Sequence, residues 1–284
     1  MKSLKEQVLD AKARGVAVGH FNISNLETLE GIFHAAKALD LPVIIGVSEG
    51  ERDFVGVHEA AALVKSLREE NNYPIYLNAD HTYSFERVKE AIDAGYDSVI
   101  FDGAKMPLDE NIAVTKKCVE YAKTCGREVL VEAELGYIGQ SSRILDGVPE
   151  GVELTTVADA TKFVSETGVD FFAPAVGNIH GMLRDMPDPK LDSVRVKEIS
   201  EATGVPLVLH GASGNTKEDI QECIKAGVAI VHINTEIRVA YRDALKKSLD
   251  ENPDEVAPYK IGKQSVRAVE EVVSEKLKIF NFLS

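Results

Sequence analysis

The feature that most constrains the fold is a pattern repeated about eight times along the chain of 284 residues. A short apolar run, rich in β-branched residues, is followed by about a dozen residues with helical periodicity. Nearly every residue of the runs is apolar, which is typical of parallel strands buried on both faces. The candidate strands are residues 16–22, 42–48, 74–80, 98–102, 129–134, 170–176, 206–210 and 228–234.

Eight βα units are the number that closes a parallel barrel. We therefore predict one α/β domain over residues 1–284, a (β/α)8 or TIM barrel, with an additional C-terminal helix at about 264–279. Amphipathic stripes at 26–39 and 85–94 fit the intervening helices, and several such segments end in glycine just before the next strand. The alternative is an open doubly wound sheet, which is disfavoured because no GxGxxG or Walker-type loop follows a strand.

Charge and composition exclude several classes of partner. Lys plus Arg number 32 and Asp plus Glu 46, so the net charge is −14, and no block of basic residues stands out. Nucleic acid or an anionic membrane is therefore not expected as a main partner, and positive charge for an anionic substrate must be local. No apolar stretch is long enough to span a bilayer, and the three cysteines have no CxxC spacing, so we expect a reduced, cytoplasmic protein.

Two connections are unusually long for a compact domain. Residues 136–154 follow the fifth predicted strand and residues 177–191 follow the sixth. Loops of this length are usually lids or binding loops.

Polar residues gather where the predicted strands end, which is the end of a βα barrel that carries the chemistry. A lone strand-end histidine is more often a hydrogen-bonded core residue, and we give His20, His34 and His58 that interpretation. Strand-end carboxylates can also merely stabilise the next helix N-terminus. A structural role for all of them is improbable, because several converge on one rim. They are Asn22, Ser48, Asp80, His81, Asp102, Glu134, His180, His210, His232 and Asn234.

Three neutral imidazoles that leave an open position are the ligand set of a catalytic divalent metal, most readily Zn²⁺. Such an ion polarises a carbonyl as a Lewis acid and stabilises a developing oxyanion. Glycines with exposed amides near Ser213, together with Asn234 and Thr235 opening the next helix, form an expected anion cradle. A metal beside an anion cradle indicates a phosphorylated carbonyl compound as substrate.

Five motifs in order resemble the class II, metal-dependent ketose-bisphosphate aldolases. They are DH at 80–81, VEAELG at 131–136, GNIHG at 177–181, LHGASG at 209–214 and INTEIR at 233–238, and the match covers essentially the whole chain. The resemblance implies reversible cleavage of fructose 1,6-bisphosphate to dihydroxyacetone phosphate and glyceraldehyde 3-phosphate. It also implies a homodimer or homotetramer.

The resemblance assigns roles residue by residue. Asp80 corresponds to the catalytic acid, and Asp102 and Glu134 match a second metal position. The zinc ligands implied are His81, His180 and His210. Residues in the place of the dihydroxyacetone phosphate site are Gly181, Gly211, Ala212, Ser213, His232, Ile233, Asn234 and Thr235, while Ser48 corresponds to an aldehyde contact and Arg184 to a phosphate-side lysine.

The chain departs from the family pattern at several positions. The loop glutamate that family members use to shuttle a proton is absent; Ser141 and Ser142 lie near that place, and Glu150 or Glu153 is a possible replacement. Where a neighbouring subunit often supplies an arginine for the second phosphate, the candidate here is Lys260.

Three alternatives remain open. The first is a tagatose-1,6-bisphosphate aldolase or a related ketose-phosphate aldolase. The second is a Schiff-base aldolase using Lys105, which would leave the histidine triad unexplained. The third is a non-catalytic barrel that stabilises a partner subunit; retention of Asp80 with all three histidines argues against it.

Overall fold

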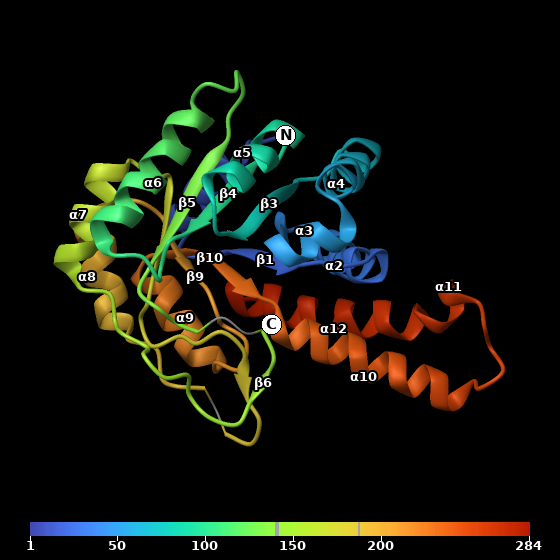
Figure 1. The fold of residues 1–284 in the computed structure, drawn as a ribbon. Helices are drawn as coiled ribbons and strands as arrows, with labels where there is room; N and C mark the ends of the chain where they lie inside the picture. Colours follow the sequence, from blue (N-terminus) through green and yellow to red (C-terminus); the bar gives the residue numbers. More distant parts are fainter. Residues whose placement is uncertain (140–141, 187) are drawn as a thin grey trace.

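The computed structural model describes residues 1–139, 142–186 and 188–284. Its centre is a closed barrel of parallel strands, each hydrogen-bonded to the next and the last to the first (Figure 1). The order around the barrel is β1 (Val18–Asn22), β2 (Val43–Val47), β3 (Ile75–Thr82), β4 (Ser98–Asp102), β5 (Leu130–Leu135), β7 (Phe171–Pro174), β9 (Leu207–Leu209) and β10 (Val228–Ile233). The predicted (β/α)8 barrel is confirmed, because each predicted apolar run overlaps one barrel strand.

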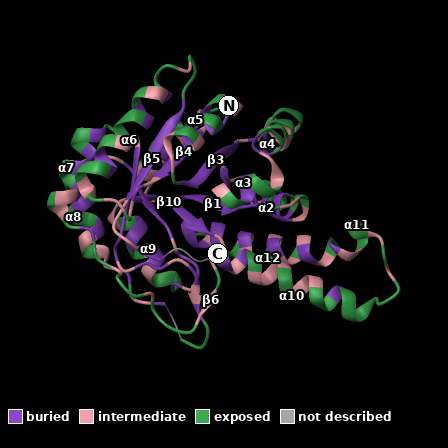
Figure 2. Cartoon of the chain, viewed as in Figure 1, coloured by how far each residue is buried: buried purple, intermediate pink, exposed green. Residues whose placement is uncertain are grey.

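Helices pack around the outside of the barrel and bury one face each against it (Figure 2). The predicted helices at 26–39 and 85–94 have the predicted bounds. Gly168 and Gly204 end helices with φ of 68° and 73°, a left-handed conformation that favours glycine. The outer helices are α2 (Leu26–Leu39), α3 (Glu49–Val55), α4 (Val57–Asn71), α5 (Phe85–Ala94), α6 (Leu108–Ala122), α7 (Val157–Thr167), α8 (Ser193–Thr203), α9 (Lys217–Ala226) and α10 (Thr235–Glu251).

The interior of the barrel is apolar at the end where the strands begin. Helix α1 (Leu4–Arg14) closes this end with Leu4, Val8 and Ala11, which are spaced to share one helical face. They pack with inward-facing strand residues such as Val18 and Ile44. Because this end is filled by hydrocarbon, polar side chains inside the barrel are confined to the other end.

The predicted C-terminal helix is confirmed as α12 (Lys263–Phe280), which packs along α2 and α10. The short α11 (Pro258–Ile261) precedes it, and α10 and α12 lie side by side and project beyond the barrel (Figure 1). No helix in the described part of the chain is both long and apolar enough to cross a bilayer.

The two long connections each carry one short strand, and these strands pair in parallel. Strand β6 (Ile144–Leu145) follows β5, and strand β8 (Met182–Leu183) follows β7. The amide of His180 also donates to the carbonyl of Ile138 at 2.8 Å. The two loops therefore support one another at the polar end of the barrel.

Candidate active site

A break in strand regularity places Asp80 and His81 in the same pocket. Successive side chains of a regular strand point to opposite faces, so neighbours could not both face the interior. Here the pairing of β3 with β4 shifts register between Ala79 and Thr82, and His81 has a φ of 32°. Both side chains line one pocket as a result. The guanidinium of buried Arg52 supports this irregular segment by donating to the carbonyl of Asp80 and the hydroxyl of Thr82.

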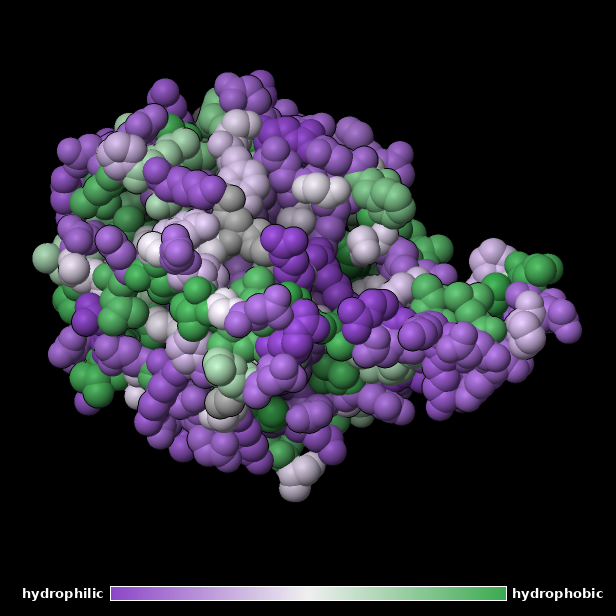
Figure 3. Space-filling view, turned by 60° about the horizontal axis from the view of Figure 1, so that its bottom comes forward, coloured by the Kyte–Doolittle hydropathy of each residue, from purple (hydrophilic) through white to green (hydrophobic). Residues whose placement is uncertain are grey.

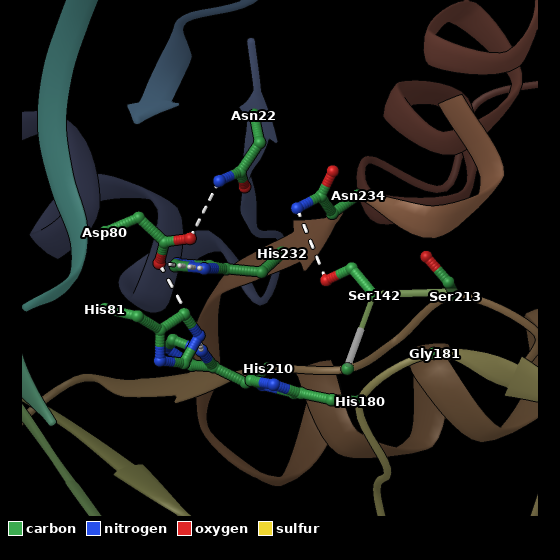
Figure 4. Close-up of a pocket in the computed structure, with 11 residues that line it drawn as sticks. Asn22, Asp80, His81, Ser142, His180, Gly181, His210, Ser213, His232 and Asn234 are labelled. Carbon is green, nitrogen blue, oxygen red and sulfur yellow. Dashed lines mark hydrogen bonds and ion pairs between the residues drawn. The ribbon is translucent and has the colours of Figure 1, made fainter. Parts of the chain in front are cut away.

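Three histidines from three strand ends meet in this pocket (Figure 4). The rings of His81 and His180 have centroids 4.6 Å apart, and those of His81 and His210 are 4.8 Å apart. One nitrogen of each ring and one carboxylate oxygen of Glu134 all lie within 4.8 Å of one another. The structure thus brings together residues that lie up to 129 positions apart in the sequence.

A carboxylate stands behind two of these imidazoles. Nδ1 of His81 lies 2.9 Å from Asp102 Oδ2, while its Nε2 faces His210 Nδ1 at 3.1 Å. Nε2 of His210 lies 2.7 Å from Glu132 Oε1. Carboxylates in this position fix the orientation of a metal-binding histidine and make it a better ligand. Asp102 therefore supports His81 rather than joining the cluster of ligand atoms.

Glu132 was missed by the sequence reasoning, although a signal for it existed. It precedes Glu134 by two residues on one strand, so both side chains face the same side. Burial raises the pKa of Glu132 to about 7, and burial together with Asp102 raises the pKa of Glu134 well above its ordinary value.

Metal binding requires neutral imidazoles, and two of the three histidines meet this condition. Burial and the neighbouring His81 lower the pKa of His210 to about 3 and that of His180 well below its ordinary value. Burial acts in the same direction on His81, but Asp80 and Asp102 outweigh it and raise the pKa of His81.

Asp80 is held by Asn22 and by the surrounding histidines, and one of its carboxylate oxygens stays available for chemistry. Asn22 Nδ2 donates to Asp80 Oδ2 at 2.8 Å (Figure 4). Oδ1 is buried without a hydrogen bond among the described residues; it lies 3.5 Å from His232 Nδ1 and 3.8 Å from His81 Nε2. Burial alone would raise the pKa of Asp80, but the surrounding histidines hold it well below its ordinary value, so the group is a carboxylate at neutral pH.

A second pair of imidazoles, those of His20 and His232, lies next to Asp80. The rings of His20 and His232 stack with centroids 3.4 Å apart and an interplanar angle of 2°. His20 also contacts Asn78 at 3.3 Å and is 1% exposed, which agrees with its predicted place in the core. The same prediction is wrong for His34 and His58, which are exposed on outer helices. Both lie on outer helices and not at strand ends, so the interpretation given to a strand-end histidine did not apply to them.

The pocket has a volume of about 30 Å³. This is enough for a metal ion or a water molecule but not for a sugar phosphate. Its lining consists of Asn22, Asp80, His81, Ser142, His180, Gly181, His210, Gly211, Ser213, His232 and Asn234.

Most of the residues predicted to bind substrate lie at this pocket. Gly181, Gly211, Ser213, His232 and Asn234 line it. Three more are buried next to them in sequence, namely Ala212, Ile233 and Thr235.

Two predicted contacts do not reach the pocket lining. Ser48 begins α3 and bonds through its amide to Glu51 Oε2 at 2.7 Å. Arg184 is exposed, and its Nε lies 2.8 Å from Asp146 Oδ1. Both positions were inferred from strand ends and family pattern, which locate the backbone but not the direction of the side chain.

The structure also shows where the candidate replacements for the loop glutamate and the candidate Schiff-base lysine lie. Glu150 and Glu153 are exposed and absent from the lining, whereas Ser142 belongs to it. Ser141 lies outside the described residues. Lys105 is exposed with its ammonium over the ring of Tyr137, so the Schiff-base alternative has no support in the pocket.

The pocket fits a divalent metal on its own geometry. Its donors are three imidazoles and a carboxylate, a set that suits Zn²⁺. Two of the imidazoles have carboxylates behind them, and Glu134 Oε2 is buried without a hydrogen bond among the described residues. This oxygen lies 3.5 Å from His81 Nδ1, and a buried carboxylate oxygen without a hydrogen bond is costly unless a cation accompanies it.

Comparisons with known proteins agree with this site. A family model described as fructose-bisphosphate aldolase class-II matches residues 2–283. The fructose-bisphosphate aldolase of Staphylococcus aureus is 40% identical over 281 residues, covering 98% of this chain and 96% of that protein. The 6-phospho-5-dehydro-2-deoxy-D-gluconate aldolase of Bacillus licheniformis is 39% identical, covering 98% and 94%. The crystal structure of the YdjI aldolase from Escherichia coli K12 has a TM-score of 0.81 at 31% identity, covering 98% and 96%.

Proposed function

The chain belongs to the class-II fructose-bisphosphate aldolase family, a family of metal-dependent carbon–carbon lyases, and on that premise we propose that it cleaves fructose 1,6-bisphosphate reversibly to dihydroxyacetone phosphate and glyceraldehyde 3-phosphate. The observation that carries the proposal is the meeting of His81, His180 and His210 beside the carboxylate of Asp80. This arrangement supplies a metal site and a proton acceptor within one pocket.

His81, His180 and His210 would hold the metal, with Glu134 close by. When bound there, a divalent cation supplies Lewis-acid chemistry, polarising a carbonyl and stabilising negative charge on oxygen. Zn²⁺ is the ion we propose, because imidazole-rich sites with an open position favour it.

Asp80 would move the proton at the bond that breaks. In cleavage, its carboxylate accepts the proton of the hydroxyl on the carbon that becomes the aldehyde. The carbon–carbon bond then breaks, and its electron pair passes to the ketone fragment. In condensation the proton returns to the new alkoxide. Asn22 keeps the carboxylate oriented for both directions, since it holds Oδ2 and leaves Oδ1 facing the pocket.

The cradle of small residues would hold the phosphate of the ketone fragment. Gly181 and Ser213 line the pocket on the side away from Asp80, where Asn234 leads into α10 (Figure 4), and Gly211 also belongs to the lining. The start of a helix presents unpaired amides and a positive dipole, both of which favour an anion.

A related ketose phosphate is the second candidate substrate. The two relatives compared above bear different names, yet their identities to this chain are 40% and 39%. Overall similarity therefore favours neither substrate strongly, and a few side chains at the aldehyde end decide between them.

A coupled cleavage assay tests the proposal. Fructose 1,6-bisphosphate, tagatose 1,6-bisphosphate and 6-phospho-5-dehydro-2-deoxygluconate are compared with and without a chelator, and Zn²⁺, Co²⁺ or Mn²⁺ is then added back. We expect the highest kcat/KM with fructose 1,6-bisphosphate, loss on chelation and recovery with metal. Full activity after exhaustive removal of metal would refute the mechanism. A preference for another ketose phosphate would show that this compound, and not fructose 1,6-bisphosphate, is the substrate.

Asp80→Asn tests whether Asp80 carries the proton. It should retain the metal and lose at least about a hundredfold in kcat, because the amide cannot accept the proton. An active variant would exclude Asp80 as the proton carrier.

We also propose that the chain forms a single domain over residues 1–284, assembles as a homodimer or homotetramer and works in the cytoplasm. The three cysteines are free, which suits a reducing compartment. Size-exclusion chromatography with light scattering tests the assembly.

A further inference from the structure

A largely buried ion pair links the C-terminal helix to the start of α10. Nζ of Lys276 on α12 lies 2.7 Å from Oε2 of Glu236, which stands in the first turn of α10. The Lys276 side chain is only 8% exposed, whereas many hydrophilic side chains cover the surface of the projecting α10–α12 hairpin (Figure 3). A lysine is almost never buried so deeply unless a partner compensates its charge, and Glu236 is that partner here.

Glu236 connects this lysine to the backbone of the anion cradle. Its Oε1 accepts a hydrogen bond of 2.9 Å from the amide of Gly214. Its own amide donates to Oγ of Ser213 at 3.4 Å. Ser213 lines the pocket and Gly214 follows it directly, so one residue of α10 holds two successive residues of the loop that forms the cradle.

The turn at Gly214 is tightly constrained and lies among carboxylates. Gly214 has a φ of 86°, and a Cβ atom there would lie 2.7 Å from Oδ2 of Asp188. That oxygen is buried without a hydrogen bond among the described residues. The carboxylates of Glu236 and Asp188 therefore both lie against a loop that is proposed to bind a phosphate.

Lys276 determines whether the Glu236 carboxylate helps or hinders an anion. The charge of Glu236 acts across the loop, since it adds to burial in raising the pKa of Asp188. An uncompensated carboxylate would repel a phosphate in the same way, with little screening by solvent. Lys276 offsets this charge and also holds the carboxylate where it accepts the Gly214 amide.

We propose that Lys276 and Glu236 are positioning residues for the phosphate of the ketone fragment. Glu236 holds the turn of Ser213 and Gly214 in its binding conformation, and Lys276 orients and neutralises Glu236. The proposal rests on the proposed function and adds that the C-terminal helix takes part in substrate binding. Neither residue is among those that line the described part of the pocket, so both act through the loop.

The test compares variants of the metal-loaded enzyme by titration calorimetry with dihydroxyacetone phosphate and with glyceraldehyde 3-phosphate. Lys276→Met removes the cation and keeps a long apolar side chain. Lys276→Met with Glu236→Gln removes both charges but keeps an oxygen that can accept the Gly214 amide, and Lys276→Met with Glu236→Leu removes that oxygen too. The matched control is Lys247→Met, because Lys247 pairs with Glu251 at 3.8 Å on an exposed part of α10.

We expect Lys276→Met to weaken binding of dihydroxyacetone phosphate at least about tenfold, because the remaining carboxylate repels the phosphate and loses its orientation. The Gln double variant should bind within about threefold of the parent, and the Leu double variant should again bind at least about tenfold more weakly. Binding of glyceraldehyde 3-phosphate and the metal content should be unchanged in all variants. In the cleavage assay, Lys276→Met should raise KM and leave kcat nearly unaltered.

Recovery of binding in the Gln double variant separates positioning from a merely structural role, in which the second substitution would add to the first. The proposal is overturned if Lys276→Met binds dihydroxyacetone phosphate like the parent, or if the two double variants bind it equally. Equal weakening of both probes would also overturn it. The comparison of the double variants is decisive even if Lys276→Met does not fold, because neither of them leaves a buried charge unpaired.

Failure of the proposed function would give a different result. Calorimetry needs no turnover, so the expected order of the variants can be observed even if no ketose bisphosphate is cleaved. Binding and KM like those of the parent in every variant would refute the positioning pair and leave the aldolase function standing.

Discussion

Gly46 on β2 offers a sharp test of how the pocket is built. A Cβ atom at this position would lie 2.1 Å from Cε1 and 2.6 Å from Nε2 of His20, far inside van der Waals contact. The His20 ring has little room to withdraw, because it stacks on His232 at 3.4 Å and contacts Asn78. Gly46→Ala must therefore displace the stacked pair by more than about 1 Å to reach ordinary contact.

The expected loss of stability follows from overpacking a rigid core. Forcing one methyl group into a filled interior destabilises a protein by about 1–3 kcal/mol. For a chain of 284 residues, 1 kcal/mol lowers Tm by roughly 2 °C, so we expect a fall of roughly 2–5 °C. Because His232 lies 3.5 Å from Asp80, we also expect kcat to fall by roughly tenfold to a hundredfold through misplacement of the carboxylate.

Thermal unfolding and the cleavage assay measure both effects against two controls. Gly50→Ala makes the same substitution in α3, where no atom lies within 4 Å of the new Cβ, and should be neutral or slightly stabilising. In a His20→Ala background the contacts with the ring are absent and only Asn22 Oδ1, at 3.1 Å, stays close, so Gly46→Ala should then have a much smaller effect on Tm. The reasoning fails if Gly46→Ala behaves like Gly50→Ala, or if its effect persists without the His20 ring.

Three further predictions concern the charged groups of the site. His180→Ala should abolish metal binding, measured by elemental analysis, and reduce cleavage to background; retained metal would exclude this ligand. Burial raises the pKa of Glu132 from 4.5 to about 7. The contribution of this group to the free energy of unfolding is therefore fully present below pH 4.5 and is lost as the pH rises towards 7. The Gln side chain of Glu132→Gln cannot ionise, so the Tm of the metal-free variant should fall less than that of the metal-free parent between pH 5 and 8. The metal affinity of the variant should fall about tenfold or more. Parallel curves of Tm against pH would contradict the assignment of this titration to Glu132. Arg52→Met should destabilise by about 3 kcal/mol in urea unfolding, because the buried carbonyls of Val47 and Asp80 lose their donor; unchanged stability would show that other groups satisfy them.

The architecture was predictable from the chain because it depends on local patterns. Apolar runs such as 42–48 and 98–102 mark strands that are buried on both faces, and each barrel strand lies within two residues of its predicted bounds at either end. Amphipathic stripes with terminal glycines mark the helices between them. These patterns involve residues that are close together in the sequence, so they can be recognised without knowledge of tertiary contacts.

The grouping of His81, His180 and His210 was predictable for a different reason. In a parallel barrel all strands end on the same rim, so polar residues at strand ends are brought together by topology alone. The direction in which each side chain points was harder to predict from the sequence. Asp80 and His81 both face the pocket only because β3 is irregular there, and a regular strand would have turned one of them away.

The sequence was therefore sufficient to predict the barrel, its order of elements and the rim that carries the proposed metal ligands. Only the tertiary structure shows that Asp102 and Glu132 stand behind His81 and His210. The physical reason is reach: long side chains cross between strands and loops, and their partners depend on register, on backbone irregularities and on the course of two long connections. None of these is a property of any short stretch of residues.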